Sequence, residues 1–244
     1  MLIDFCLPAK DEALILQANA QRLFSYLDKL KLKHDWRIVI LINGSTDQSF
    51  NIAADLEKNN PKYFRATNYQ IGGKSLALKE YFKISEADIL VFMDIDLAVS
   101  LEDIPDLINP LLEDQVDLVI GSRLLPESKT GRSALREMSS HNYNRLARLV
   151  FRNKVSDLQC GFKALKKSLF KRLEPYFQDN RWFFDAELIM LSLKFNYRLK
   201  QIPVDWLENR FFERTSKVKN SEAWYFVKEL FALKKRLKKI EIEN

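Results

Sequence analysis

The chain has 244 residues, of which 47% are hydrophobic, 30% charged and 12% aromatic, and its formal net charge is +6. This composition is typical of a globular protein and excludes a disordered or fibrous chain, and the length favours one large domain. No apolar run exceeds five residues, whereas a membrane-spanning helix needs about 20, so we expect no such helix. The start of the chain carries acids where a secretion signal is apolar, and two cysteines are too few for a disulfide framework. We therefore expect a cytoplasmic, reduced protein.

Strand-like and helical segments alternate through the first half of the chain. The expected strands are residues 2–7, 37–42, 63–66, 89–93 and 118–120, and the expected helices are residues 12–32, 47–57, 74–84 and 101–112. Beyond residue 121 we expect a helix over 133–151, a loop over 157–163, a helix over 182–196 and a strand over 198–205. This alternation predicts a single α/β domain with a mostly parallel central sheet flanked by helices.

Polar residues follow four of the expected strands at the points where the strands end. They are residues 8–12 (Pro-Ala-Lys-Asp-Glu), 43–47 (Asn-Gly-Ser-Thr-Asp), 94–96 (Asp-Ile-Asp) and 121–123 (Gly-Ser-Arg). Ligands of an open parallel sheet bind beyond the carboxyl ends of its strands, so these segments form the candidate site. Asp94 and Asp96 directly follow an apolar strand, where two carboxylates can meet a hard cation and a sugar phosphate together. Such a pair can also simply cap the following helix.

Charge is distributed unevenly along the chain. Residues 86–117 contain ten acids and no Lys or Arg, whereas residues 121–172 contain thirteen bases and three acids. An acidic segment beside a basic one suits a cation next to an anionic ligand, although both segments can also be ordinary solvated surface.

The C-terminal segment, residues 219–244, predicts a basic amphipathic helix that follows the main domain at residues 1–218. Its apolar residues recur at spacings of four and three, with lysines and an arginine between them; they are Phe226, Leu230, Leu233, Leu237 and Ile240. A helix of this kind fits an anionic membrane surface, and it fits packing on its own domain equally well.

Taken together, the motifs resemble family 2 glycosyltransferases of the GT-A (nucleotide-diphospho-sugar transferase) fold. Within that family they are most similar to dolichyl-phosphate and polyprenyl-phosphate glucosyltransferases and mannose synthases. The matching segments, in order, are residues 8–12, 43–47, 72–77, 94–97, 121–123, 157–163 (Asp-Leu-Gln-Cys-Gly-Phe-Lys), 184–187, 202–206 and 216–217. They extend over nearly the whole chain, and the segment 157–163 points to the glucosyltransferases.

The resemblance implies a binding site for a nucleotide-sugar donor. The residues that it places there are Pro8, Ala9, Glu12, Asn43, Asp47, Lys74, Asp94 and Lys217. Asp94 would face the nucleotide and the sugar, and Asp96 would ligate Mg²⁺ or Mn²⁺ with the diphosphate, with Asp94 as a second candidate ligand. Asn43 stands where the family usually has an aspartate, which leaves the choice between uracil and guanine open.

The resemblance also implies an acceptor site. Arg123, Arg136 and Ser140 match positions that hold the acceptor phosphate in mannose synthases, so the implied catalytic residues are Asp94, Asp96, Arg123 and Arg136. Ala98 stands where the mannose synthases often have a glutamine that also binds the metal.

The implied reaction is inverting transfer of a hexose, expected to be glucose from UDP-glucose, onto a polyprenyl phosphate. That acceptor is already anionic at neutral pH and needs aligning cations rather than a base. The alternative is transfer to a hydroxyl of a surface glycan, for which Asp157, Asp185 or Glu187 would be the candidate base.

Two further function classes are weaker alternatives. A sugar-nucleotide pyrophosphorylase would need a glycine-rich turn near residue 10, and a nucleic-acid-binding module would need clustered aromatic residues in its basic segments. We therefore expect no nucleic-acid partner. We expect location at the inner face of the membrane through peripheral contact, and a separate membrane-protein partner stays open.

Overall fold

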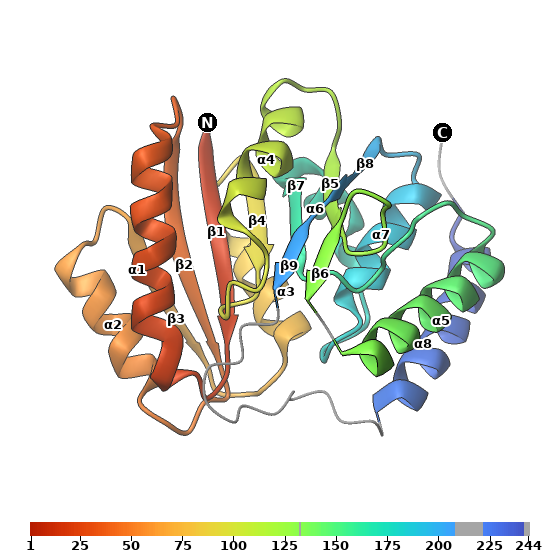
Figure 1. The fold of residues 1–244 in the computed structure, drawn as a ribbon, viewed down its shortest axis with the longest axis horizontal. Helices are drawn as coiled ribbons and strands as arrows, with labels where there is room; N and C mark the ends of the chain where they lie inside the picture. The colour runs from red at the N-terminus through yellow and green to blue at the C-terminus, as the bar shows by residue number, and fades with distance from the viewer. Residues whose placement is uncertain (132, 208–221, 242–244) are drawn as a thin grey trace.

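The structure, a computed structural model, describes residues 1–131, 133–207 and 222–241. A seven-stranded sheet lies between two layers of helices (Figure 1). The strands in spatial order are β3 (Phe64–Tyr69), β2 (Asp35–Asn43), β1 (Leu2–Ala9), β4 (Ile89–Met93), β7 (Phe162–Lys166), β5 (Leu118–Ser122) and β8 (Leu199–Pro203). Within this sheet β7 alone is antiparallel to its neighbours β4 and β5. The predicted α/β class and mostly parallel sheet are confirmed.

The two helical layers follow from the alternation of side chains along the strands. On β1, Phe5 and Leu7 face one layer and Cys6 faces the other, and all three are fully buried. The first layer contains α1 (Ala13–Leu30), α2 (Ser49–Asn59) and α4 (Ile104–Leu112), the last preceded by the 3₁₀ turn η1 (Leu101–Asp103). The second layer contains α3 (Lys74–Ile84), α5 (Ala134–Phe151), α6 (Lys167–Leu173), the 3₁₀ turn η2 (Glu174–Tyr176), α7 (Phe184–Lys194) and α8 (Glu222–Lys239).

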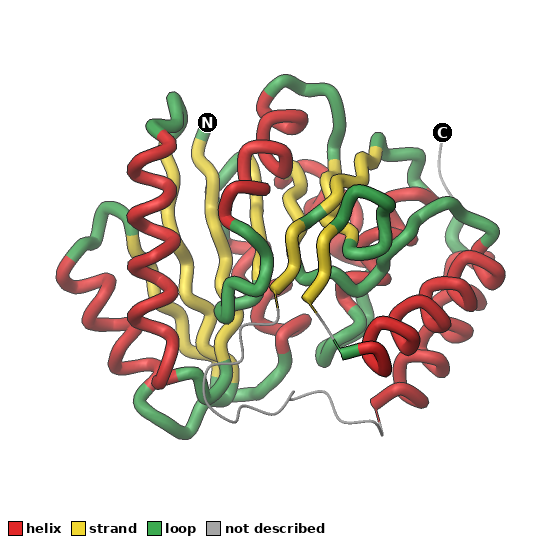
Figure 2. The backbone as a smooth tube through the Cα atoms, viewed as in Figure 1, coloured by secondary structure: helices red, strands yellow, loops and turns green. Residues whose placement is uncertain are grey.

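In the second half of the chain, helix α6, turn η2 and the strand Lys129–Gly131 were not expected, and two expected segments take another form. Residues 157–163 were expected to form a loop, but Phe162 begins strand β7, which enters the middle of the sheet. The sequence Phe-Lys-Ala-Leu-Lys has no continuous apolar run, because Lys163 interrupts it. In the structure Lys163 is buried and donates to the carbonyl of Cys160 and to Oδ1 of Asp185. The strand expected over 198–205 is divided into β8 and β9 (Asp205–Leu207), and β9 pairs with β6 (Lys129–Gly131) in a separate two-stranded sheet (Figure 2).

The C-terminal helix α8 packs on the domain. It lies beside α5 and α7, and its residues Leu230 and Leu233 are fully buried (Figure 1). Two roles were predicted for this helix, and packing on the domain is the one that the structure shows. Among the described residues, no helix combines the length and the apolar character that crossing a membrane requires.

Candidate active site

The loops after β1 and β2 interlock at the carboxyl edge of the sheet. Asp11, which follows β1, accepts hydrogen bonds from the backbone N–H of Thr46 at 2.7 Å and from its hydroxyl at 3.2 Å. Asp47 accepts a bond at 3.0 Å from the N–H of Ala13, the first residue of α1, and a second at 2.9 Å from the N–H of Ser49 in α2. The carboxylate of Asp47 therefore satisfies N–H groups at the start of two helices, which is what an N-terminal cap does.

Asn43 ends β2 and joins three backbone segments. Its side-chain NH₂ donates to the carbonyl of Ala9 at 2.9 Å and to that of Leu41 at 3.3 Å, and its carbonyl accepts from the N–H of Gly73 at 3.2 Å. A carboxylate has no N–H to donate to those two carbonyls. Asparagine, rather than the aspartate usual in the resembling family, is thus the residue that satisfies this arrangement. Pro8 and Ala9 are buried in β1 beside it, and Glu12 is buried at the start of α1.

The Asp94-Ile-Asp96 segment forms a tight turn at the end of β4. Leu97 adopts a left-handed conformation, with a φ of 49°, and its N–H donates to the carbonyl of Asp94 at 3.1 Å. For a leucine this conformation is strained, and such strain persists only where the surroundings impose it. The N–H of Ala98 donates to Oδ1 of Asp96 at 3.3 Å. The turn presents both carboxylates, each partly exposed, at the carboxyl edge of the sheet.

Gly161 provides the space that the Asp94 carboxylate occupies. A Cβ at this position would lie 2.8 Å from the carboxyl carbon of Asp94 and 2.9 Å from Oδ1, with Oδ2 closer still. Real Cβ atoms do not approach other atoms so closely, so residue 161 has to be glycine if Asp94 is to keep this position.

Lys74, the first residue of α3, pairs with Asp94. Its Nζ lies 2.6 Å from Oδ1 of Asp94, and its side chain is only 11% exposed. Burial lowers the pKa of Lys74, but the charges of Asp94 and Asp185 outweigh burial, so the pKa lies above its ordinary value. Lys74 therefore carries a full positive charge beside the Asp-x-Asp turn.

A second buried pair lies next to the first. Nζ of Lys163 is 2.5 Å from Oδ1 of Asp185, and the Lys163 side chain is fully buried. The ammonium groups of Lys74 and Lys163 lie 5.8 Å and 5.7 Å from the centre of the Phe92 ring. Two carboxylates and two ammonium groups thus balance one another around one aromatic ring.

Arg123 is held by Asp157. Its Nε and Nη2 donate to the two carboxylate oxygens at 2.7 Å and 3.0 Å, a bidentate pair whose side chains are 7% and 0% exposed. Burial raises the pKa of Asp157, but the charge and hydrogen bonds of Arg123 outweigh burial and lower the pKa to about 2. The guanidinium also lies 4.9 Å from the centre of the Trp206 ring. Arg123 is thus rigidly oriented, with only part of its N–H groups used by this pair.

Helix α5 carries the other two residues predicted at the acceptor. Arg136 is half-buried and Ser140, one turn further along, is 8% exposed. Asn144 donates to the carbonyl of Ser140 at 3.0 Å and accepts from the N–H of Leu158 at 2.9 Å. Asn144 therefore connects α5 to the loop that holds Asp157.

The predicted metal site fits a cation that keeps other ligands. Among the described residues, no three His, Cys, Asp or Glu side chains come together as a metal-binding group. Asp94 and Asp96 would supply two carboxylates, and donor phosphates and waters the rest, which is how Mg²⁺ is usually held. The Asp94 side chain is 38% exposed, so a cation can reach it.

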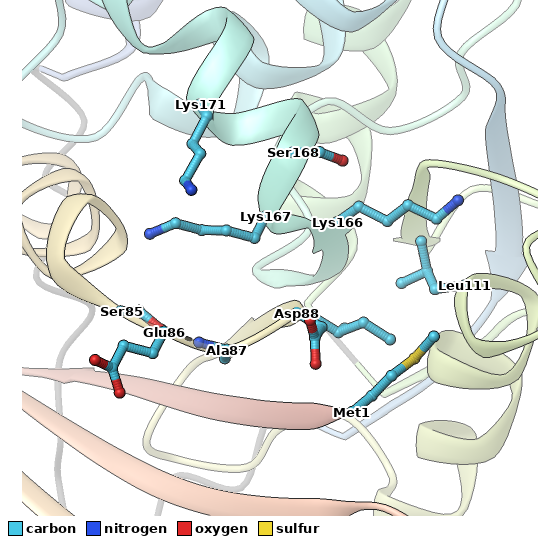
Figure 3. A pocket seen from close by; sticks show the side chains of 11 residues that line it. Met1, Ser85, Glu86, Ala87, Asp88, Leu111, Lys166, Lys167, Ser168 and Lys171 are labelled. Atoms are coloured by element: carbon cyan, nitrogen blue, oxygen red, sulfur yellow. Dashed lines mark hydrogen bonds between the residues drawn. The ribbon is translucent and has the colours of Figure 1, made fainter.

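A cavity of about 410 Å³ opens at the opposite, amino-terminal edge of the parallel strands (Figure 3). Lysines line it, but their charges are largely occupied: Lys166 pairs with Asp114 and Asp117, and Lys167 donates to the carbonyls of Phe82 and Lys83. Asp94, Asp96 and Arg123, which follow the carboxyl ends of β4 and β5, lie at the other edge, as ligand binding in open parallel sheets requires.

The prediction omitted several residues of this site and named two that the structure does not describe. Gly161 and Lys163 lie in the matching segment 157–163. Their contacts with Asp94 and Asp185 join segments far apart in the chain, so the sequence carries no signal for them. Trp206 ends the matching segment 202–206 but was given no role there, and Asn144 lies in no motif. Ser216 and Lys217 lie outside the described residues.

Known proteins resemble the chain over most of its length. A family model described as glycosyl transferase family 2 matches residues 4–174. Glycosyltransferase AglD of Haloferax volcanii is 28% identical over 204 residues, which cover 84% of this chain and 33% of AglD. Dolichyl-phosphate beta-glucosyltransferase of Saccharomyces cerevisiae is 27% identical over 198 residues, covering 74% of this chain and 59% of the yeast protein. The chain therefore spans less than two thirds of the length of these relatives.

Solved structures share the fold. Glucosyl-3-phosphoglycerate synthase from Mycobacterium tuberculosis in complex with UDP superposes with a TM-score of 0.68 at 18% identity, over 99% of this chain and 81% of the other. A complex of that enzyme with Mn²⁺, UDP and glucosyl-3-phosphoglycerate gives a TM-score of 0.64 at 18% identity. The match over residues 4–174, the sheet order and the Asp-x-Asp turn agree: the chain has the GT-A fold and belongs to glycosyl transferase family 2.

Proposed function

We propose that the chain transfers a hexose, glucose from UDP-glucose, onto a polyprenyl phosphate with inversion at the sugar. The observation that carries the acceptor class is that each of the three carboxylates named as a candidate general base is held in an ion pair. Asp157 pairs with Arg123, Asp185 with Lys163 and Glu187 with Arg236. Asp157, with a pKa of about 2, is a very weak base at neutral pH. A phosphate acceptor needs no base, because its second pKa is about 6.

We assign one group of residues to the donor and another group to the acceptor. The donor would contact Pro8, Ala9, Glu12, Asn43, Asp47 and Lys74, and the acceptor phosphate would contact Arg123, Arg136 and Ser140. Lys217 is assigned to the donor by the resemblance alone. Mg²⁺ or Mn²⁺ bound by Asp94 and Asp96 would neutralise charge on the departing diphosphate. Arg123, oriented by Asp157, and Arg136 would align the acceptor phosphate for in-line attack on the sugar carbon. The dolichyl-phosphate beta-glucosyltransferases among the relatives support this acceptor.

The test is release of UDP from UDP-glucose with Mn²⁺ or Mg²⁺, in the presence and absence of a polyprenyl phosphate. We expect lipid-dependent release that the Asp96→Asn variant loses. Release from GDP-mannose but not from UDP-glucose would change the donor assignment and make Asn43 the residue to study. Absence of release with any donor would refute lipid-phosphate transfer.

A hydroxyl acceptor is the alternative, and one comparison favours it. The structural relative from Mycobacterium tuberculosis was crystallised with UDP-glucose and phosphoglyceric acid, and its product is glucosyl-3-phosphoglycerate. Incubation with saccharide alcohols in place of the lipid separates the two, since only the alternative predicts release with these acceptors.

We also propose peripheral contact with an anionic membrane through the outer face of α8, at the cytoplasmic side. Opposite the buried Leu230 and Leu233, Trp224 is 77% exposed and Phe231 53% exposed. The exposed lysines of the same helix are Lys228, Lys235, Lys238 and Lys239. Aromatic and basic side chains on one helix suit the interface of an anionic bilayer.

Sedimentation with phosphatidylglycerol vesicles tests this contact. Trp224→Ala combined with Phe231→Ala should release the protein from the vesicles. The matched control is Leu14→Ala on α1, at a residue that is 96% exposed on another helix. Equal binding by all three proteins would show that α8 is not the contact.

A further inference from the structure

One of the two carboxylates of the Asp-x-Asp turn is already paired with a lysine, whereas the carboxylates of an open cation site carry uncompensated negative charge. Lys74 is the first residue of α3, and its Nζ lies 2.6 Å from Oδ1 of Asp94, close enough for a charge-assisted hydrogen bond. An ammonium group thus already neutralises one of the two carboxylates that would bind a metal. A divalent cation approaching Asp94 would meet a fixed positive charge at this distance.

Lys74 has a second acidic neighbour. The charge of Asp185 also raises the pKa of Lys74, and Asp185 itself is held by Lys163 at 2.5 Å. Asp94 is 38% exposed whereas the Asp185 side chain is 10% exposed, so Asp94 is the partner that an incoming ligand can reach. If Lys74 lost its contact with Asp94, the negative charge of Asp185 would therefore still compensate its charge in the interior.

We propose that Lys74 is an internal counter-ion of Asp94, which weakens cation binding by the Asp-x-Asp turn until a nucleoside diphosphate arrives. This inference rests on the proposed role of Asp94 and Asp96 as metal ligands. The diphosphate brings negative oxygens that Lys74 can contact instead of Asp94, and the freed carboxylate then joins Asp96 at the cation. Nucleotide and cation consequently bind with positive coupling, each favouring the other.

The test measures binding of Mn²⁺ from the electron paramagnetic resonance signal of the free ion, with and without UDP. In the unsubstituted protein we expect Mn²⁺ to bind at least about tenfold more tightly with UDP than without it, a coupling of typical size. Lys74→Met removes the competing charge, so nucleotide-free Mn²⁺ binding should become about tenfold tighter, and the effect of UDP should shrink.

The matched control is Lys83→Met, near the other end of α3. Lys83 is exposed and pairs with Glu80 and Glu174, so this variant removes one positive charge from the same helix without touching the turn. Its Mn²⁺ binding should equal that of the unsubstituted protein. Circular dichroism of Lys74→Met should show an unchanged fold, because Asp94 is exposed enough to be solvated when its partner is lost.

The outcomes separate this inference from the proposed function. If the unsubstituted protein binds Mn²⁺ with UDP or GDP, but Lys74→Met binds the free ion no more tightly, Lys74 is not the competing counter-ion. If the unsubstituted protein binds no Mn²⁺ with either nucleotide, the metal role of Asp94 and Asp96 is itself refuted. Tighter binding by Lys83→Met as well would show a general charge effect and would also overturn the inference.

Discussion

Replacing Asp157 with asparagine removes the carboxylate from the buried pair with Arg123. The Asp157 side chain is fully buried and that of Arg123 is 7% exposed, so the guanidinium would stay charged with little access to water. Loss of one partner from a buried pair costs about 3–5 kcal/mol of folding free energy. The pKa gives a second measure: a fall from 3.8 to about 2 corresponds to roughly 2 kcal/mol. We therefore expect Asp157→Asn to be about 2–5 kcal/mol less stable.

The same pair predicts a pH dependence of stability. The pKa of Asp157 is lower in the folded than in the unfolded chain, so its contribution is fully present above pH 4. The contribution should be lost as the pH falls from about 4 to about 2, where the folded protein also becomes protonated. In Asp157→Asn this part of the pH dependence should be absent.

Urea unfolding followed by circular dichroism at pH 7 and at pH 3 measures both effects. The double variant Arg123→Met with Asp157→Leu serves as the control, because replacing both charges with apolar groups leaves no uncompensated charge. It should regain most of the stability that the single variant loses. A loss below about 1 kcal/mol in Asp157→Asn, or a double variant as unstable as the single one, would refute the reasoning.

Three further substitutions test individual contacts. Gly161→Ala should displace the Asp94 carboxylate and lower kcat by about a hundredfold, measured by UDP release, because a displacement near 1 Å in a site can cost this much. Tyr81→Phe removes a 2.6 Å hydrogen bond to the fully buried Asp4 and should cost about 1–3 kcal/mol in urea unfolding. Asn43→Asp loses two donated hydrogen bonds and should also cost about 1–3 kcal/mol, with the same measurement.

Matched controls accompany these substitutions. Gly72→Ala places its Cβ against the movable end of Lys10, so it should keep the structure of the Asp94 turn. Tyr143→Phe removes a buried hydroxyl that has no hydrogen-bond partner among the described residues, so it should leave stability unchanged or raised. Equal losses in Tyr143→Phe and Tyr81→Phe, or full activity of Gly161→Ala, would contradict these assignments. For Asn43→Asp, unchanged stability would contradict the role of the donated bonds.

The first half of the fold could be predicted because its signals are local. Apolar runs such as Ile38–Ile42 and Ile89–Met93 became the central strands β2 and β4, and the polar residues after them reached one edge of the sheet. Parallel strands bring their carboxyl ends together whatever the details of packing. The position of Asp94 and Asp96 therefore followed from the sequence.

The second half could not be predicted in the same way, because its signals depend on distant partners. The segment Phe162–Lys166 reads as polar, since Lys163 interrupts it, yet it forms strand β7 in the middle of the sheet. A buried lysine is stable there because Asp185, on helix α7, balances its charge. No local pattern contains that information.

The sequence by itself determined the α/β class, the edge of the sheet that carries the site, and the residue types gathered there. Only the tertiary structure decided which charges neutralise one another: Lys74 with Asp94, and Arg123 with Asp157. The physical reason is that a charge in the interior has to be compensated, and its partner is chosen by proximity in space. Whether an acidic residue serves as a ligand, a base or a structural partner thus depends on contacts between segments far apart in the chain.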